Sequence, residues 1–214
     1  MVKKIYKIDP INPDLSILED IAREVARGAV IIYPTDTVYG VGGSIFNSEV
    51  LERIARIKGR SKPFPIVVDS LESAMKIGLF NEKAIKLARA FWPGPLTIKV
   101  YARMSLSKLL VDHEGKIAVR VPGSNVATEL ARLCGGFIVS TSANKTGLKP
   151  PRSLSEALDQ IGDEVDIAID SGPAPHGVPS TIIDVTMNPP VIIRVGALSK
   201  RVIERVIGEV RVEG

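Results

Sequence analysis

Positive charges gather in the segment Arg53-Ile-Ala-Arg-Ile-Lys58-Gly-Arg60-Ser-Lys62, which carries five cations in ten residues and no acidic residue. Like charges held this close repel one another unless an anion lies between them. Lysine supplies a point charge and arginine a two-pronged donor, and together they suit a polyphosphate. We therefore interpret Lys58 and Arg60 as candidate phosphate ligands. Arg53 and Arg56 better fit a solvated helix face, because cations near a helix C-terminus are mildly stabilising.

Hydroxyl groups gather in two other segments. Residues 34–43 (PTDTVYGVGG) follow a short apolar strand and combine two threonines, a carboxylate, a phenol and three glycines. Ligands of open α/β sheets bind at the carboxyl ends of strands, and glycines let the backbone approach them. In the second segment, Ser140, Ser142 and Asn144 fall on one side of a predicted strand, because side chains alternate with period two. A tight turn and a polar strand edge explain these segments equally well, so both alternatives stay open.

Two arginines stand alone among apolar neighbours. Arg120 interrupts the strand-like run Ala-Val-Arg-Val, and Arg194 follows two isoleucines just before Gly196. A buried arginine needs an acidic partner or a ligand carboxylate or phosphate. A nearby loop rich in glycine and proline brings Ser180 to the start of another strand.

The elements that must position these groups alternate along the chain. Apolar spacing and capping residues predict helices near residues 15–26, 48–58, 70–78, 81–91, 124–133, from 153 onward and 198–207. Short apolar runs predict strands at residues 29–33, 64–68, 96–101, 117–121, 137–140, 165–169, 181–185 and 191–195. The connections between residues 171 and 191 are too short for crossover helices and favour a mixed sheet. With no repeat and no linker-like segment, one α/β domain is the simplest account.

Composition excludes several classes of protein. The chain has 214 residues, 45% apolar and 24% charged, which suits one globular domain. Its single cysteine, Cys134, cannot form an intramolecular disulfide, and one cysteine with two histidines cannot supply a Cys/His zinc site. No apolar run reaches the roughly 20 residues of a membrane span, and the charged N-terminus lacks a secretory signal. We therefore expect a soluble, cytoplasmic protein, and its net charge of +4 favours an anionic ligand.

Five motifs occur in one order along the chain: YPTDTVYG at residues 33–40, KGR at 58–60, STSAN at 140–144, PSTIID at 179–184 and RVGA at 194–197. Together they resemble the YrdC/Sua5 family, the threonylcarbamoyl-AMP synthases, over about residues 10–208. The resemblance implies a single-domain α/β fold with a twisted mixed sheet curved around a large basic cavity. Residues 1–214 look like the short form of the family, without the second domain of the long Sua5 form.

The resemblance also implies a reaction. Members condense L-threonine, bicarbonate or CO2 and ATP into L-threonylcarbamoyladenylate and pyrophosphate, a nucleotidyltransferase reaction that serves N6-threonylcarbamoyladenosine at position 37 of tRNA. ATP would be a substrate that brings Mg2+ with it, and neither a permanently bound cofactor nor a protein metal site is expected. The product would pass to a tRNA threonylcarbamoyl transferase, and contact with tRNA or double-stranded RNA is left open.

The family's site residues carry over by motif. Its Lys-x-Arg and Ser-x-Asn tetrad falls on Lys58, Arg60, Ser142 and Asn144, which should hold the ATP phosphates and form the catalytic set. The resemblance adds Arg194 as an ATP contact and Lys62 as a weaker candidate for a phosphate contact. For L-threonine it implies four residues, with Arg120 pairing with the carboxylate: Thr35, Arg120, Ser140 and Ser180. The loop after Arg60 looks shorter than in many members, so its phosphate contacts are open to rearrangement.

Two alternatives compete with this reading. One is a module that binds tRNA or ribosomal RNA without chemistry, and the other is a YrdC-like paralogue that uses a different amine or nucleotide. An RNA-binding surface spreads its cations over an exposed face. Here the cations cluster at residues 58–62, while Arg120 and Arg194 lie among apolar residues. That distribution favours a small anionic ligand in a pocket.

Overall fold

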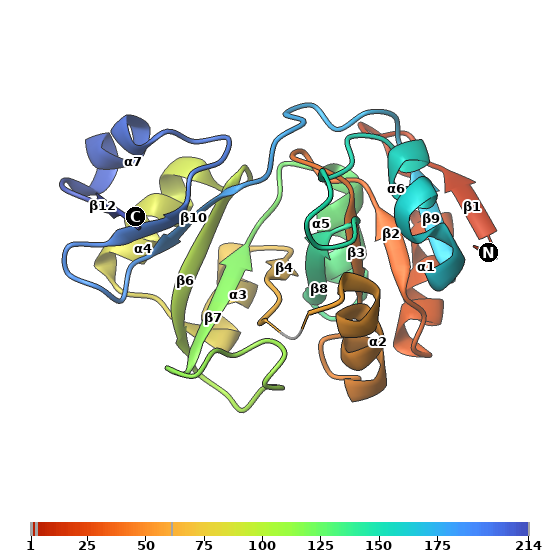
Figure 1. Ribbon diagram of the computed structural model, residues 1–214, viewed down its shortest axis with the longest axis horizontal. Coiled ribbons are helices and arrows are strands. Elements are labelled where there is room, and N and C mark those ends of the chain that lie inside the picture. Colours follow the sequence, from red (N-terminus) through yellow and green to blue (C-terminus); the bar gives the residue numbers. More distant parts are fainter. Residues whose placement is uncertain (1, 3, 61, 214) are drawn as a thin grey trace.

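One twisted mixed sheet runs through the computed structural model, which describes residues 2, 4–60 and 62–213 (Figure 1). Its strands lie in the order β1-β9-β2-β3-β8-β4-β7-β6-β10-β11-β12, and β5 pairs with β6 beside that path. The strands are β1 (Lys4–Lys7), β2 (Ile31–Tyr33), β3 (Gly40–Gly43), β4 (Ile66–Val68), β5 (Gly78–Leu79), β6 (Leu96–Ala102), β7 (Lys116–Arg120), β8 (Phe137–Ser142), β9 (Ile167–Asp170), β10 (Thr181–Asp184), β11 (Val191–Arg194) and β12 (Arg211–Val212).

The helices are α1 (Leu15–Ala26), α2 (Ser48–Lys58), α3 (Leu71–Ile77), α4 (Glu82–Phe91), α5 (Asn125–Leu133), α6 (Leu154–Ile161) and α7 (Lys200–Ile207), with a 3-10 turn η1 (Gly162–Glu164). Figure 1 shows β6, β7 and β10 with α4 and α7 on the left, and β2, β3, β8 and β9 with α1, α2 and α6 on the right. The loop over residues 171–180 crosses the top between these two halves. In the part of the chain that the structure describes, no helix is both long and apolar enough to cross a bilayer.

The predicted α/β architecture is confirmed, and so is the mixed sheet. Parallel pairs such as β4 with β7 alternate with antiparallel pairs such as β3 with β8 and β6 with β7. Each predicted helix and strand is present, with ends shifted by at most two residues. The sequence did not predict β1, β5, β12 and η1, because such short elements carry little periodicity.

β3 is the main difference from the sequence prediction, which treated residues 34–43 as one ligand loop. Its residues are Gly-Val-Gly-Gly, and glycine is depleted in strands. Here the missing side chains are required by packing. A Cβ atom on Gly42 would lie 2.1 Å from the backbone oxygen of Val139 on β8 and 3.0 Å from the Tyr33 ring. The glycines therefore allow a buried central strand to lie close to its neighbours.

Two hydrophobic cores cover the two faces of the sheet. One core joins apolar residues of α1 and α5 to the sheet face that carries Val67 and Ile138. The other core packs α2, α4 and α7 among others against the opposite face. Val67 lies opposite Ile138 on one side and opposite Arg120 on the other, so these three side chains share a face. The face that packs on α1 and α5 thus continues past their edge to Arg120, where it is open.

Candidate functional site

A cavity of about 350 Å³ opens on that uncovered face, between the two halves of the sheet. Its walls come from β3, β4 and β8 on one side and from β6, β7, β10 and β11 on the other, together with the loop at residues 35–39, Arg60 and residues 62–65. Six cationic residues line it: Arg60, Lys62, Lys99, Lys116, Arg120 and Arg194. Among the described residues, Asp112 is the one acidic residue in the lining. The expected basic cavity is therefore present.

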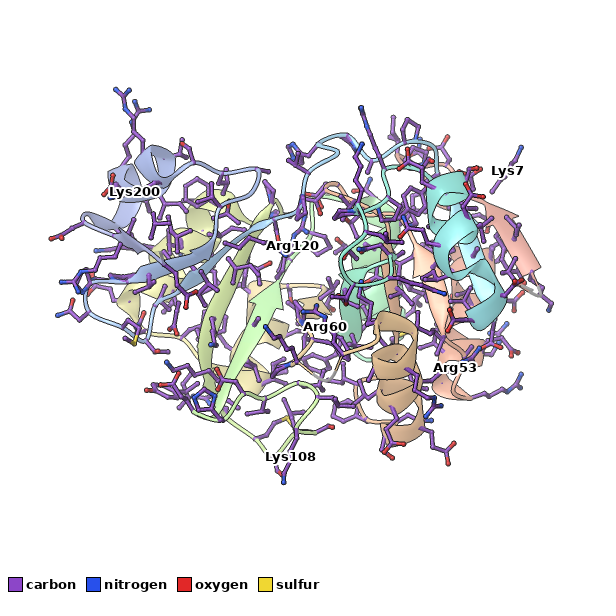
Figure 2. The ribbon with its side chains drawn as sticks, viewed as in Figure 1. Lys7, Arg53, Arg60, Lys108, Arg120 and Lys200 are labelled. Atoms are coloured by element: carbon purple, nitrogen blue, oxygen red, sulfur yellow. The ribbon has the colours of Figure 1, made fainter. Side chains whose placement is uncertain are left out.

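Eight of the ten predicted site residues line this cavity, and two do not. Those in the wall are Thr35, Arg60, Lys62, Arg120, Ser140, Ser142, Ser180 and Arg194. Figure 2 shows Arg60 and Arg120 in the middle of the molecule, between the two halves of the sheet. Lys58 and Asn144 lie behind the wall instead, and both are buried.

The Lys58 ammonium is surrounded by oxygen atoms of the β8 terminus. Its Nζ donates to the backbone oxygen of Ser142 at 2.6 Å, to Oδ1 of Asn144 at 3.1 Å, and to the backbone oxygen of Asn144. The Asn144 amide donates in turn to the backbone oxygens of Lys145 and Leu148. Burial, and then the charge of Arg60, lower the pKa of Lys58 to about 7. Lys58 and Asn144 therefore fix the turn that presents Ser142, and their polar groups do not reach the cavity directly.

Arg60 leaves the helix at a left-handed glycine. Asn47 caps the start of α2 by accepting from two backbone N–H groups, and Gly59 ends the helix with φ of 62°. This reversal sends Lys58 and Arg60 in different directions although one residue separates them. The Arg60 guanidinium lies 5.8 Å from the centre of the buried Phe64 ring, and burial lowers its pKa. Its Nε has no hydrogen-bond partner within the described part of the chain.

Arg120 is a buried cation of the cavity wall, and its acidic partner is Asp36. Its Nη2 donates to Oδ1 of Asp36, its Nη1 to Oγ1 of Thr37 at 2.8 Å, and its Nε to the backbone oxygen of Gly94 at 2.9 Å. Burial lowers the pKa of Arg120, and the Asp36 carboxylate opposes that shift. Of the two partners that sequence reasoning left open, the acidic residue is present inside the protein.

Thr35 lines the cavity, but its hydroxyl is already engaged. Oγ1 donates to the backbone oxygen of Val38 at 2.7 Å and accepts from the backbone N–H groups of Thr37 and Val38. A direct hydrogen bond from this hydroxyl to a ligand, as the resemblance implied, would require the turn to open. Sequence reasoning missed Thr37, whose signal was its place two residues further along the same segment.

Arg194 and Ser180 meet on the opposite wall. Both Nε and Nη2 of Arg194 donate to the backbone oxygen of Ser180, at 3.1 and 2.8 Å, and Nη2 also lies 3.1 Å from its hydroxyl. That hydroxyl shares a 2.8 Å hydrogen bond with Thr97 on β6. Burial, and then the charges of Arg120 and Arg60, lower the pKa of Arg194. Three guanidinium groups from distant segments thus act on one another across the cavity.

An ion cluster at the β6–β7 end of the cavity was not predicted. Lys116 is almost fully buried, and its Nζ lies 3.1 Å from Asp184 and 2.9 Å from Glu114. Next to it, Lys99 pairs with Asp112 at 2.6 Å. The only available signal was the alternation of polar residues with apolar ones along β6, which also fits a solvated strand face.

Comparisons with known proteins agree with this architecture. The family model Sua5_yciO_yrdC, described as telomere recombination, matches residues 23–196. Threonylcarbamoyl-AMP synthase of Pyrococcus abyssi is 34% identical over 193 residues, which cover 88% of this chain and 56% of that protein. The chain thus spans little more than half the length of this relative. A putative threonylcarbamoyl-AMP synthase of Mycobacterium tuberculosis is 36% identical over 192 residues, which cover 86% of this chain and 86% of that protein.

Solved structures show the same fold. The crystal structure of P. abyssi Sua5 complexed with L-threonine superposes with a TM-score of 0.93 at 32% identity, covering 98% of this chain and 62% of that one. The crystal structure of E. coli YciO superposes with a TM-score of 0.83 at 28% identity, covering 92% of this chain and 96% of that one.

Proposed function

We propose a function for this chain, which belongs to the Sua5_yciO_yrdC family. We propose that it is an L-threonylcarbamoyladenylate synthase, an enzyme that condenses L-threonine, bicarbonate or CO2 and ATP and releases pyrophosphate. The names of the relatives and the L-threonine in one solved relative support this assignment.

The observation that carries the proposal is the convergence of Arg60, Arg120 and Arg194 on one cavity lined by hydroxyl groups. Its volume of about 350 Å³ lies within the range of small-molecule sites. Guanidinium groups bind phosphates and carboxylates through paired donors. A site with three of them suits a substrate pair that brings a triphosphate and an amino acid carboxylate.

The proposed reaction follows from these groups. The threonine amine captures CO2 to form a carbamate, and a carbamate oxygen then attacks the α-phosphorus of ATP. The bond from this phosphorus to the bridging oxygen breaks, and pyrophosphate leaves with its electrons. Arg60 and Arg194, with Lys62 at the rim, stabilise the charge on the transferring and leaving phosphates. Arg120 holds the threonine carboxylate, so that the amine and the phosphorus lie side by side.

The buried pair Lys58 and Asn144 takes a positioning part in this proposal. Lys58 holds the backbone oxygens of Ser142 and Asn144, and its Nζ also lies 3.4 Å from the Ser142 hydroxyl, so it fixes Ser142 in the wall of the cavity that Arg60 also lines. The phosphates then meet Arg60 and Ser142 directly. Mg2+ arrives with the ATP as part of the substrate.

The proposal includes partners outside the cavity. The adenylate is passed to a tRNA threonylcarbamoyl transferase for the modification of adenosine 37. With that role we propose a cytoplasmic location for the protein. A module that binds RNA without chemistry remains the competing function, and it predicts no turnover of ATP. A paralogue with another substrate predicts turnover that depends on a different amine.

The test is the release of pyrophosphate from ATP and bicarbonate, measured with and without L-threonine. We expect release only when threonine is present. Arg60→Ala should lower kcat/KM for ATP at least ten-fold, because a charge-assisted hydrogen bond to phosphate contributes about 1.5–3 kcal/mol. Arg201→Ala, at an exposed position on α7, is the matched control and should leave the rate unchanged. Release that does not depend on threonine, or no release at all, would contradict the proposal.

A further inference from the structure

The turn at residues 35–38 contacts the side of the Arg120 guanidinium that faces the protein, and these contacts set the orientation of the guanidinium. A guanidinium group has five N–H donors. Among the described residues, Gly94, Thr37 and Asp36 take one donor each, on Nε, Nη1 and Nη2 respectively. One donor therefore remains on each terminal nitrogen. Two donors on the two terminal nitrogens are the pair that forks a carboxylate.

The direction of the hydrogen bonds in this turn is fixed by its two ends. The backbone oxygen of Val38 can only accept, so the single hydroxyl proton of Thr35 is committed to it at 2.7 Å. Thr37 must then supply the proton in the 3.0 Å bond between the two threonine hydroxyls. One of the two lone pairs of the Thr37 hydroxyl accepts from Arg120, which can only donate. The chain runs from Arg120 to Thr37 to Thr35 to Val38 and has no alternative polarity.

Asp36 binds the other terminal nitrogen of Arg120, Nη2, from the side away from the cavity. It is 5% exposed and is absent from the cavity lining, although both neighbouring threonines belong to it. Its second oxygen, Oδ2, faces Gly123, where a Cβ atom would lie at 3.3 Å, and has no hydrogen-bond partner among the described residues. The carboxylate therefore acts on Arg120 and leaves the ligand side of the guanidinium free.

We propose that Asp36 and Thr37 are positioning residues that hold the Arg120 guanidinium with one N–H of each terminal nitrogen turned to an α-carboxylate in the cavity. This inference rests on the proposed function, in which Arg120 binds the carboxylate of threonine. It gives Thr37, whose hydroxyl bridges Arg120 to the turn, an indirect part in threonine binding, whereas the resemblance implied direct binding by Thr35. It also gives Asp36 a reason to be buried beside an anion site, since an unpaired buried guanidinium would be costly.

The test compares two ligands that differ at the carboxylate. Calorimetric titration gives the Kd of L-threonine and of L-threoninamide, in which an amide replaces the carboxylate. Thr37→Val removes the hydroxyl at nearly constant volume, Thr37→Ser keeps it, and Asp36→Asn keeps one oxygen acceptor for Arg120. Thr128→Val is the matched control, because the hydroxyl of Thr128 on α5 donates to the backbone oxygen of Ser124, the N-cap of that helix.

We expect the unsubstituted protein to prefer threonine over threoninamide, and Thr37→Val to lower that preference about ten-fold. Asp36→Asn should lower it as well, because the carboxylate partner of Nη2 is lost. Thr37→Ser and Thr128→Val should keep the original preference, and KM for ATP should change less than two-fold in all four variants. A purely structural role would change the Kd of both ligands and the KM for ATP by similar factors.

The outcomes separate two failures. If the unsubstituted protein binds neither ligand, the proposed function is wrong. If it binds threonine and the preference is unchanged in both Thr37→Val and Asp36→Asn, the positioning role is wrong while the proposed function stands. If Thr37→Val does not fold, the same question is decided by comparing Asp36→Asn with Thr37→Ser in their preference for threonine over threoninamide.

Discussion

The charge on Lys58 should control the use of ATP between pH 7 and pH 9. Its ammonium holds the backbone of Ser142 and Asn144 beside the proposed phosphate site. Burial and the charge of Arg60 lower its pKa to about 7, so the proton is half lost near neutral pH. Loss of that proton removes one donor from the turn and one positive charge from the surroundings of the phosphates. We therefore expect kcat/KM for ATP to fall as the pH rises.

The size of the effect follows from the pKa of about 7. The protonated fraction falls from about one half at pH 7 to about one hundredth at pH 9, which predicts a roughly 50-fold loss of kcat/KM. The unfolded chain keeps the ordinary pKa of 10.5, so the native state binds fewer protons above pH 7. The free energy of unfolding should therefore rise with pH, by about 2 kcal/mol between pH 7 and pH 9. Activity and stability change in opposite directions for one physical reason.

The assay is initial-rate pyrophosphate release at saturating L-threonine and limiting ATP, from pH 6.5 to pH 9.5. Lys58→Met removes the titrating group and keeps most of the side-chain volume. It should be slow at every pH, and its profile contains only the ionisations of ATP and threonine. Lys145→Met, at an exposed lysine near the same turn, is the control and should keep the profile of the unsubstituted protein.

The ratio of the two profiles isolates Lys58. We expect the advantage in kcat/KM of the unsubstituted protein over Lys58→Met to shrink about 50-fold between pH 7 and pH 9. Parallel profiles up to pH 9 would refute it, since they would place the pKa of Lys58 well above the range in which the structure puts it.

Three further predictions test other parts of the structure. Gly42→Ala should lower the free energy of unfolding by about 1–3 kcal/mol in urea denaturation, because its Cβ would meet the backbone of Val139 at 2.1 Å; an unchanged midpoint would contradict the close approach of β3 and β8. Asp184→Asn should lower the free energy of unfolding by about 1–3 kcal/mol in the same measurement, because the buried Lys116 loses one of its two carboxylate partners, Asp184 at 3.1 Å, and keeps Glu114 at 2.9 Å. Arg194→Ala should raise KM for ATP about ten-fold and leave KM for threonine nearly unchanged, and the reverse pattern in steady-state kinetics would assign Arg194 to the amino acid.

Helices and buried strands could be predicted from the sequence because their signals are local. The α2 helix shows this, with Asn47 as its cap, apolar residues at three- and four-residue spacing and Gly59 as its end. The β3 strand could not be predicted in the same way. Its three glycines read as a flexible loop, and the backbone atom that excludes a side chain at Gly42 belongs to Val139, almost a hundred residues away.

The candidate site shows the same limit. Residue types and spacing led to Arg60, Arg120 and Arg194, and the cavity joins them. The contacts of Lys58 come from residues 84 and 86 positions further along the chain, so its inward orientation had no local signal. The need of Arg120 for an acidic partner was predictable from its apolar surroundings. The identity of that partner, Asp36, depends on how β7 lies beside the turn at residues 35–38.

The proposal that one cavity joins threonine, bicarbonate or CO2 and ATP is tested most directly by mass spectrometry of the reaction products formed with 13C-bicarbonate. We expect an adenylate that carries threonine and one labelled carbon, and that is absent when threonine is left out. The label should disappear from this product when unlabelled bicarbonate is supplied. An adenylate of threonine without the labelled carbon, or AMP and pyrophosphate formed without threonine, would contradict the account.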